Sequence, residues 1–248
     1  MTDQQDILFG IRPVLEAIEA GRNIERVLIR KGLQSDQLHE LLSAIRNSSI
    51  PYQFVPVEKL NRITRKNHQG VVAFTSLVTY LPIEEVVTRV FESGKDPLIV
   101  ILDGITDVRN MGAIARSAEA AGAHALLVPE KGSAQINPDA MKTSAGALSR
   151  IPVCRTPDLS RSVGLLKQAG LTLVGASEKS EVVYHQADLH SPLALVMGSE
   201  DTGISTSILA LCDQVVRIPM MGSIASLNVS AAAAVLLFEV VRQRTGSN

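Results

Sequence analysis

From residue 97 to the C-terminus, short apolar runs alternate with stretches of helical pattern. The apolar runs read PLIVIL, HALLV, IPVCR, LTLVGA, LALVMG and QVVRIP. Strands that are apolar throughout and separated by helices are typical of a parallel sheet with helices on both faces. The sequence therefore predicts an α/β fold, in which ligands bind at the carboxyl ends of the strands.

The first 76 residues predict a separate and smaller α/β module. Helical patterns cover GIRPVLEAIEAG, SDQLHELLSAIRNSS and VEKLNRIT, and strand patterns cover IERVLIRK, PYQFVP and GVVAFTS. After this module, Pro82 and Gly94 surround one weak helical pattern, IEEVVTRVFESG, and such punctuation is typical of a linker. We therefore expect a domain over 1–76, a linker over 77–96 and a second domain over 97–248.

Composition and charge exclude several classes of protein. The formal net charge is -1, which argues against non-specific coating of nucleic acid but leaves a local basic patch open. The N-terminal MTDQQD lacks a secretory signal pattern, and the longest apolar run, Ala231 to Phe238, is too short to cross a bilayer. Cys154 and Cys212 show neither a disulfide framework nor metal-ligand spacing. We expect a cytoplasmic protein with no metal and no membrane partner.

The first strand-end loop, residues 102–122, carries two polar candidates, Asn110 and Arg116. The following helix is expected to begin near Gly112, so that Asn110 is either its N-cap or a site residue. Arg116 points away from the apolar face of that helix. Spacing alone favours a solvated Arg116, but an Arg one turn into a helix of small residues is also placed to reach a ligand at the strand ends.

The second loop, LVMGSEDTGIS over residues 195–205, has two glycines at the spacing of a phosphate-binding loop. Ile204 stands where that motif needs its Lys, and Glu200 and Asp201 would repel a triphosphate. The loop therefore suits a neutral or cationic ligand and disfavours a nucleotide hydrolase. No G-x-G-x-x-G follows a strand, and no Ser-His-Asp or Cys-His arrangement stands out.

The third loop lies in RIPMMGSIASLNVSAAAAVLLFEV, residues 217–240. Ser226 is a credible N-cap of the last helix, with Asn228 and Ser230 in its first turn. Capping explains Ser226 but does not explain why the loop is rich in Gly and Ser, or why loops of small residues recur at three strand ends. The loop is therefore a candidate wall of a ligand site.

Together these loops resemble the motifs of the SpoU (TrmH) family of ribose methyltransferases in the SPOUT class. The first motif is Asn-x-Gly with an Arg four residues later, here Asn110, Gly112 and Arg116. The second is a strand ending in Gly-x-Glu, here MGSEDTG, and the third is IPMMGSIASLNVSAAAA. All three occur in the family's order and at family-like spacing. The chain departs from the family at Asp201, where many relatives carry Gly.

The resemblance covers nearly the whole chain and implies its architecture. It implies a C-terminal SPOUT domain with a deep trefoil knot and a dimer packed through the knot region. FGIRPVLEAI and NHQGVVAF are similar to the N-terminal substrate-binding domain of the bacterial members that methylate large-subunit ribosomal RNA. That domain has a ribosomal-protein-like fold. The implied partners are ribosomal RNA and a second copy of the chain.

The resemblance also implies S-adenosylmethionine as the cofactor and a ribose 2′-hydroxyl as the methyl acceptor. The positions that match the family's cofactor-binding motif are Gly198, Ile218, Met220 and Leu227. This cofactor is a sulfonium cation with a neutral adenosine body. It therefore needs no phosphate-binding Lys.

The implied catalytic residues are Arg116, Asn110, Glu200, Ser226 and Asn228. Family reasoning assigns Arg116 to activating the hydroxyl. Because Arg is almost always protonated, it acts either as a desolvated base or by positioning a phosphate or stabilising the alkoxide. Asn110 and Glu200 would orient Arg116 and the target nucleotide, while Ser226 and Asn228 would complete the pocket by hydrogen bonding.

Residues 58–70, EKLNRITRKNHQG, form a candidate RNA-binding patch. Lys59, Arg62 and Lys66 fall on one face of a predicted short helix, and Arg65 lies beside them. On sequence alone, these residues are as well explained by an ordinary solvated surface as by an RNA-binding patch. The resemblance to the methyltransferase family favours contact with RNA phosphates.

The leading hypothesis is thus a 2′-O-methyltransferase that acts on a guanosine of large-subunit (23S) ribosomal RNA. A transfer-RNA methyltransferase is the alternative in the same class, and the N-terminal module disfavours it. A non-catalytic RNA-binding assembly factor is an alternative of another class. The intact set of Asn110, Arg116, Glu200 and Asn228 disfavours it.

Overall fold

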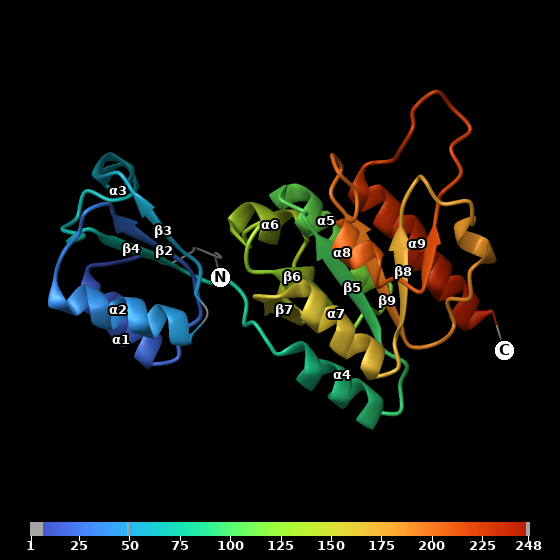
Figure 1. Ribbon diagram of the computed structural model, residues 1–248, viewed down its shortest axis with the longest axis horizontal. Helices are drawn as coiled ribbons and strands as arrows, with labels where there is room; N and C mark the ends of the chain where they lie inside the picture. The colour runs from blue at the N-terminus through green and yellow to red at the C-terminus, as the bar shows by residue number, and fades with distance from the viewer. Residues whose placement is uncertain (1–6, 49, 247–248) are drawn as a thin grey trace. The chain divides into compact units, whose positions relative to one another are not determined.

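A computed structural model describes residues 7–48 and 50–246 (Figure 1). The N-terminal hexapeptide, in which the sequence shows no signal pattern, lies outside these residues. The chain divides into two compact units. The first runs to Thr79 and includes residues 136–138, and the second comprises the rest of the chain from Tyr80 onward.

The N-terminal unit is a four-stranded sheet with helices on both faces. Its strands are β1 (Ile7–Phe9), β2 (Ile24–Arg30), β3 (Tyr52–Val55) and β4 (Val71–Thr75), in the order β1-β4-β2-β3. Its helices are α1 (Ile11–Glu19), α2 (Asp36–Asn47) and α3 (Val57–Ile63). All six elements predicted for this region are present, and β1 is a short strand that the pattern did not reveal.

Two apolar cores hold this sheet. On one face, Val27, Ile29 and Val71 of the sheet pack with the buried sides of α1 and α2. On the other face, Leu28, Val72 and Phe74 pack against Leu60 of α3. Alternate residues of β2 therefore point into different cores, as the two-residue period of a strand requires.

The C-terminal unit is a six-stranded parallel sheet, in the order β10-β8-β9-β5-β6-β7. The strands are β5 (Leu98–Asp103), β6 (Ala125–Pro129), β7 (Val153–Thr156), β8 (Thr172–Ala176), β9 (Leu193–Gly198) and β10 (Gln214–Val216). The six apolar runs of the sequence thus form the six strands, and the predicted α/β class with a parallel sheet is confirmed.

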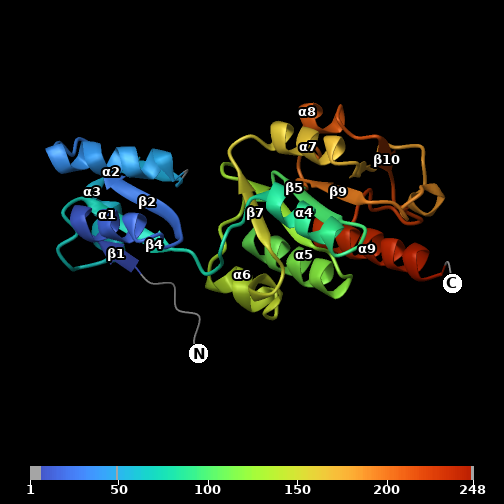
Figure 2. The ribbon, with the colours of Figure 1, turned by 90° about the horizontal axis from the view of Figure 1, so that it is seen from below.

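Helices cover both faces of this sheet, as Figure 2 shows. One face carries α4 (Ile83–Glu92), α7 (Leu159–Gln168) and the short α8 (Thr206–Leu209), around a core that includes Ile99, Ile101, Leu127, Leu173 and Val196. On the other side, α5 (Val108–Ala120) packs along α9 (Val229–Thr245). The remaining elements are α6 (Pro138–Thr143) and two single turns, η1 (Ala147–Ser149) and η2 (Tyr184–Gln186).

Most of the segment expected as a linker, 77–96, is structured within the C-terminal unit. Its weak helical pattern is α4, whose residues 83, 86, 87 and 90 are buried in the core described above. Just before it, the Leu81 amide donates to the Val153 carbonyl over 3.1 Å. The apolar residues of α4 recur at spacing i, i+3, i+4 and i+7, which is the spacing of a packed helix. Charged residues lie between them, and these made the helical pattern look weak in the sequence.

Two helices begin elsewhere than the sequence suggested. Helix α5 begins at Val108, and its N-cap is Asp107, whose carboxylate accepts from the backbone amides of residues 109 and 110. Asn110 therefore lies in the first turn with its side chain free of the capping role. Helix α9 begins at Val229, and its N-cap is Asn228, so Ser226 is a residue of the preceding loop and caps nothing.

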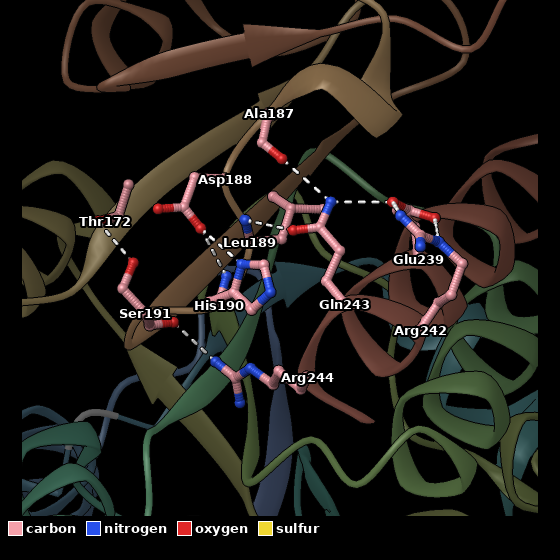
Figure 3. A network of polar contacts seen from close by, with 10 residues as sticks. All are labelled: Thr172, Ala187, Asp188, Leu189, His190, Ser191, Glu239, Arg242, Gln243 and Arg244. Carbon is pink, nitrogen blue, oxygen red and sulfur yellow. Dashed lines mark hydrogen bonds and ion pairs between the residues drawn. The ribbon is translucent and has the colours of Figure 1, made fainter. Parts of the chain in front are cut away.

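The last turns of α9 are tied to the segment before β9 (Figure 3). The buried Gln243 donates to the Ala187 carbonyl over 3.0 Å and accepts from the Leu189 amide over 2.8 Å. It also donates to Glu239, whose pKa is lowered by the hydrogen bonds from Arg242. A buried amide satisfied on both its oxygen and its nitrogen fixes this end of α9 in one register.

Arg244 fastens the same helix end to the amino ends of two central strands. Its guanidinium donates to three backbone carbonyls, those of Asp96, Pro97 and Ser191. These carbonyls lie just before β5 and β9, at the amino edge of the sheet. The C-terminal helix is therefore anchored at the edge of the sheet opposite the strand-end loops.

Gly112, the glycine of the Asn-x-Gly motif, marks a close approach of α5 to α6. A Cβ at this position would lie 2.6 Å from the Ala140 carbonyl oxygen and 2.8 Å from the Thr143 Cβ. Both distances are below van der Waals contact, so only glycine allows the observed packing. The motif glycine thus has a packing reason.

We expect Gly112→Ala to destabilise the C-terminal unit by about 1–3 kcal/mol, because overpacking forces the two helices apart. The measurement is urea unfolding followed by circular dichroism. Gly164→Ala is the matched control, since Gly164 lies inside α7, where an added Cβ would meet nothing within 4 Å. It should leave stability unchanged or raise it by up to about 1 kcal/mol. Equal effects of the two substitutions would contradict the packing role.

Candidate active site

The carboxyl edge of the parallel sheet holds a cavity of about 230 Å³. One water molecule occupies roughly 30 Å³ of liquid, so the cavity admits an organic ligand. Its walls come from the ends of β8, β9 and β10 and from the start of α9. The lining includes apolar side chains of Met197, Val216, Leu227 and Leu236. Ligands of open α/β sheets bind at this edge.

The turn after β9 forms one wall of the cavity. Ser199 and Gly203 exchange two backbone hydrogen bonds of 3.1 and 2.9 Å, which close the turn. A Cβ on Gly198 would lie 2.2 Å from the Gly203 carbonyl carbon and from the Ile204 nitrogen. The turn therefore folds directly over Gly198, and no other residue fits there. Asp201 belongs to this turn and is exposed at the cavity wall.

A polar cluster of Asn110, Glu200 and Asn228 lies beside the cavity. The Asn228 side-chain nitrogen donates to Asn110 Oδ1 over 3.0 Å and to Glu200 Oε1 over 2.5 Å. Glu200 Oε1 also accepts from the Val229 amide over 3.3 Å. The carboxylate thus lies at the N-terminus of α9, where the helix dipole favours negative charge. Residues from three loops, up to 118 positions apart in sequence, meet at one point.

The other predicted cofactor positions line the same cavity. Gly198, Ile218, Met220 and Leu227 are all part of its wall, and so is Ser226. Ile218 is half-buried, whereas Ser226 and Leu227 are exposed in the loop before α9. The structure therefore brings together every predicted site residue of the C-terminal unit except Arg116.

Arg116 lies apart from this cluster. It is exposed on α5 and is absent from the cavity wall, and within residues 7–48 and 50–246 it makes no hydrogen bond or ion pair. Asn110 and Arg116 are six residues apart, so they are about 9 Å apart along the helix and about 120° apart around it. When Asn110 turns toward Asn228, Arg116 leaves α5 in another direction.

The sequence patterns missed two parts of the site. Ser177, Glu178 and Lys179, which follow β8, line the cavity, and they belong to no motif. Asp103, the last residue of β5, accepts from the Ser205 amide over 2.7 Å and ties the turn after β9 to the neighbouring strand. Asp103 and residues 177–179 all lie at strand ends. That position is the feature of the sequence from which they could have been predicted as site residues.

The predicted RNA patch is exposed but is not one helical face. Lys59 and Arg62 lie on α3, which ends at Ile63. Lys66 lies in the following loop with its Nζ 5.1 Å from the centre of the Phe9 ring, a cation–π contact. The expectation that Lys66 continues the helical face is therefore wrong, because Thr64 has an extended backbone conformation. Arg65 lies in the same loop.

The part of the chain that the structure describes holds neither a cluster of metal ligands nor a membrane-spanning helix. Over 7–48 and 50–246, three or more His, Cys, Asp or Glu side chains never gather in a way that would hold a metal ion. Over the same residues, every helix is too short or too polar to cross a membrane.

The fold and the site define an α/β protein with a parallel sheet and a cavity for an organic ligand at its strand ends. Residues 97–238 match the family described as "SpoU rRNA Methylase family", and residues 7–81 match "RNA 2'-O ribose methyltransferase substrate binding". The chain belongs to the SpoU methylase family and is an RNA methyltransferase. The resemblance of the three loops to this family is confirmed.

Relatives with known names and structures agree with this assignment. A Bacillus subtilis protein assigned to the TrmH family of tRNA/rRNA methyltransferases is 32% identical over 98% of each chain. The SpoU methyltransferase AviRb of Streptomyces viridochromogenes, solved with AdoMet, is 31% identical, with a TM-score of 0.63 over 98% of this chain and 92% of that chain. AdoMet is S-adenosylmethionine, so the expected cofactor is confirmed for the family.

A third relative is named for transfer RNA. The TrmH/SpoU tRNA modifying enzyme of A. aeolicus is 29% identical, with a TM-score of 0.56. It covers 66% of this chain, and 84% of its own length is matched. Relatives of this fold therefore include enzymes named for transfer RNA as well as for ribosomal RNA.

We expect Gly198→Ala to weaken the binding of S-adenosylmethionine at least about tenfold, because the turn after β9 cannot close over a methyl group. Isothermal titration calorimetry measures the affinity, and thermal melting shows whether the domain is folded. The control is Gly222→Ala in the loop before α9, where a Cβ meets nothing within 4 Å. A folded Gly198→Ala variant with unchanged affinity would contradict the assignment of this turn to the cofactor.

Proposed function

We propose that this chain transfers a methyl group from S-adenosylmethionine to a ribose 2′-hydroxyl, on a guanosine of large-subunit ribosomal RNA in the cytoplasm. The observation that carries the proposal is the joining of the cavity at the strand ends to the cluster of Asn110, Glu200 and Asn228. When bound, the cofactor supplies an electrophilic methyl group on a sulfonium ion. The trefoil knot that the resemblance implies stays a prediction.

The cavity wall fits such a cofactor. The turn of residues 198–203 and residues 216–218 and 220 line the cavity, and apolar side chains such as Leu227 and Leu236 complete the wall. Gly198, Ile218, Met220 and Leu227 would hold the cofactor through backbone amides, carbonyls and apolar contact. The carboxylate of Glu200 beside the cavity favours a ligand with net positive charge. The Lys that a triphosphate site needs is absent from the turn.

The cluster of Asn110, Glu200 and Asn228 would position the target ribose. Asn228 uses both of its amide hydrogens within the cluster and accepts from Ser230, so its orientation is fixed. The amide nitrogen of Asn110 has no hydrogen-bond partner among the described residues, so it remains as a donor for the ribose. Ser226, exposed in the loop, adds a hydroxyl at the mouth of the cavity.

Arg116 activates the acceptor, and we propose that it does so in the site of a second copy of the chain. It lies outside the cavity of its own chain, so one chain alone offers an incomplete site. A guanidinium near the 2′-hydroxyl stabilises the forming alkoxide or holds the adjacent phosphate. Either role lowers the cost of removing the hydroxyl proton.

Helix α9 offers a surface for this second copy. Its outward stripe at spacing i, i+3, i+4, i+7 and i+10 is apolar, and Phe238 on it is 50% exposed. The stripe consists of Ala231, Ala234, Val235, Phe238 and Val241. The small residues allow close helix approach, and the larger ones add apolar area, which suits a homodimer.

A transfer-RNA substrate is the second candidate, which the A. aeolicus relative favours. The N-terminal unit favours ribosomal RNA instead, because that relative matches only 66% of this chain. Methyl transfer from labelled S-adenosylmethionine to total RNA of a strain lacking the protein, followed by mapping of the modified nucleotide, separates the two. No label in any RNA would refute the enzymatic proposal.

We expect Arg116→Ala to lower methyl transfer by about 100-fold or more, because the hydroxyl loses its activating group, with cofactor affinity unchanged. Single-turnover transfer and calorimetry measure the two quantities. Arg89→Ala, at an exposed Arg on α4, is the control and should keep both. A near-normal rate for Arg116→Ala would contradict its catalytic role.

Mixing two inactive variants tests whether Arg116 acts across the dimer. Arg116→Ala and Asn228→Ala chains, refolded together, should recover about a quarter of wild-type activity, because half of the dimers are mixed and each has one intact site. Each variant refolded alone is the control. If Arg116 served its own chain, the mixture would stay inactive.

We expect the double substitution Arg62→Ala and Lys66→Ala to weaken RNA binding and to reduce the slope of log affinity against log salt by about 1.5–2, because two phosphate contacts are lost. Fluorescence anisotropy over a salt series measures the slope. Arg89→Ala again serves as the control. An unchanged slope would remove these residues from the RNA interface.

A further inference from the structure

The N-terminal unit exposes two aromatic rings side by side on its edge strand β3. Tyr52 is 40% exposed and Phe54 is 43% exposed. Their ring centroids lie 5.9 Å apart with an interplanar angle of 84°. The whole chain has only five Phe, three Tyr and no Trp, and burying a ring would stabilise the fold. Building on the proposed function, we infer that this pair is a stacking site for unpaired bases of the RNA substrate.

The backbone of the same two residues is also open to a ligand. The carbonyl of Pro51 accepts from the Val27 amide and that of Val55 from the Lys31 amide, each over 2.9 Å. Alternate residues of a parallel strand bond to the same neighbour, so the backbone groups of residues 52 and 54 point away from β2. Among the described residues no strand lies beyond β3. The pair thus offers π faces for stacking and amide and carbonyl groups for base edges.

Positive charge gathers around this strand. The segments 22–31 and 52–66, which include β2, β3 and α3, together contain eight Lys and Arg but only two Glu. Arg30 is paired in register with Val55 at the end of β3, and the exposed Lys31 follows it. The chain as a whole has a net charge of -1, so this excess is local. A polyanion that passes along β3 is attracted on both sides.

Single-stranded RNA fits these features better than other partners do. Stacking on an aromatic side chain requires a base that is out of its duplex, because a paired base has both faces covered. Residues 7–81 match an RNA substrate-binding family, and β3 lies within them. The pair would therefore hold an unpaired stretch of RNA, while Lys59 and Arg62 hold phosphates.

The first test replaces the rings but keeps apolar side chains. We expect Tyr52→Leu with Phe54→Leu in the full-length chain to weaken binding of a fluorescein-labelled 20-nucleotide single-stranded RNA about tenfold or more, because base stacking on both rings is lost. The salt slope should stay unchanged, because rings release no counterions. Phe91→Leu, at a lone ring 38% exposed on α4, is the matched control. Unchanged affinity of a folded double variant would overturn the inference.

The second test uses the absence of Trp from the chain. Phe54→Trp introduces a single fluorophore at the site, and stacking with RNA bases should quench its emission. Phe91→Trp is the control and should not be quenched by the same RNA. Equal quenching of both, or of neither, would overturn the inference.

The remaining outcomes separate this site from the catalytic proposal. If the double Leu variant binds RNA normally but elutes later on gel filtration than the wild type, β3 joins two copies of the chain and the stacking site is wrong. If Phe54→Trp is quenched but no RNA accepts a methyl group, the stacking site stands and the proposed reaction fails. If the wild type transfers methyl groups but the double Leu variant binds RNA with normal affinity, the proposed reaction stands and the stacking site is wrong.

Discussion

The side chain of Asn228 is the interaction on which the candidate site depends. Its nitrogen donates to Asn110 and Glu200, and its oxygen accepts from the Ser230 amide as the cap of α9. One carboxamide thus joins the loops after β5 and β9 to the start of the last helix. A carboxylate here would repel Glu200, and an aliphatic side chain would bond nothing. Only an amide supplies two donors and an acceptor in this arrangement.

Close backbone approach is the second constraint on the site. The turn after β9 lies directly over Gly198, and α5 lies directly against α6 at Gly112. At Gly198 the contact leaves no room for a side chain, so at this point the turn meets the cavity with its backbone. Such a wall suits a cofactor with a neutral body and one positive charge. The carboxylate of Glu200 is then the natural charge to lie beside it.

The two units divide the work of binding. The C-terminal unit offers a cavity lined by charges of both signs, whereas the N-terminal unit concentrates Lys and Arg around β2, β3 and α3. RNA binding by the N-terminal unit is therefore expected to weaken as salt rises. The apolar outward stripe of α9 and the position of Arg116 outside the cavity support one further proposal. It is the proposal that a second copy of the chain completes each site.

The sequence by itself determined the class of fold, since six apolar runs separated by helices can bury themselves only in a parallel sheet covered on both faces. It also located the three strand-end loops, because their motifs are local. Only the tertiary structure decided that Asn228 rather than Ser226 caps α9, and that residues 83–90 pack into the C-terminal core. Each of these depends on contacts between residues distant in sequence. Local propensity carries no information about such contacts, so the sequence favoured Ser226 as the cap of α9, whereas Asn228, bonded to Glu200 and Asn110, is the cap in the structure.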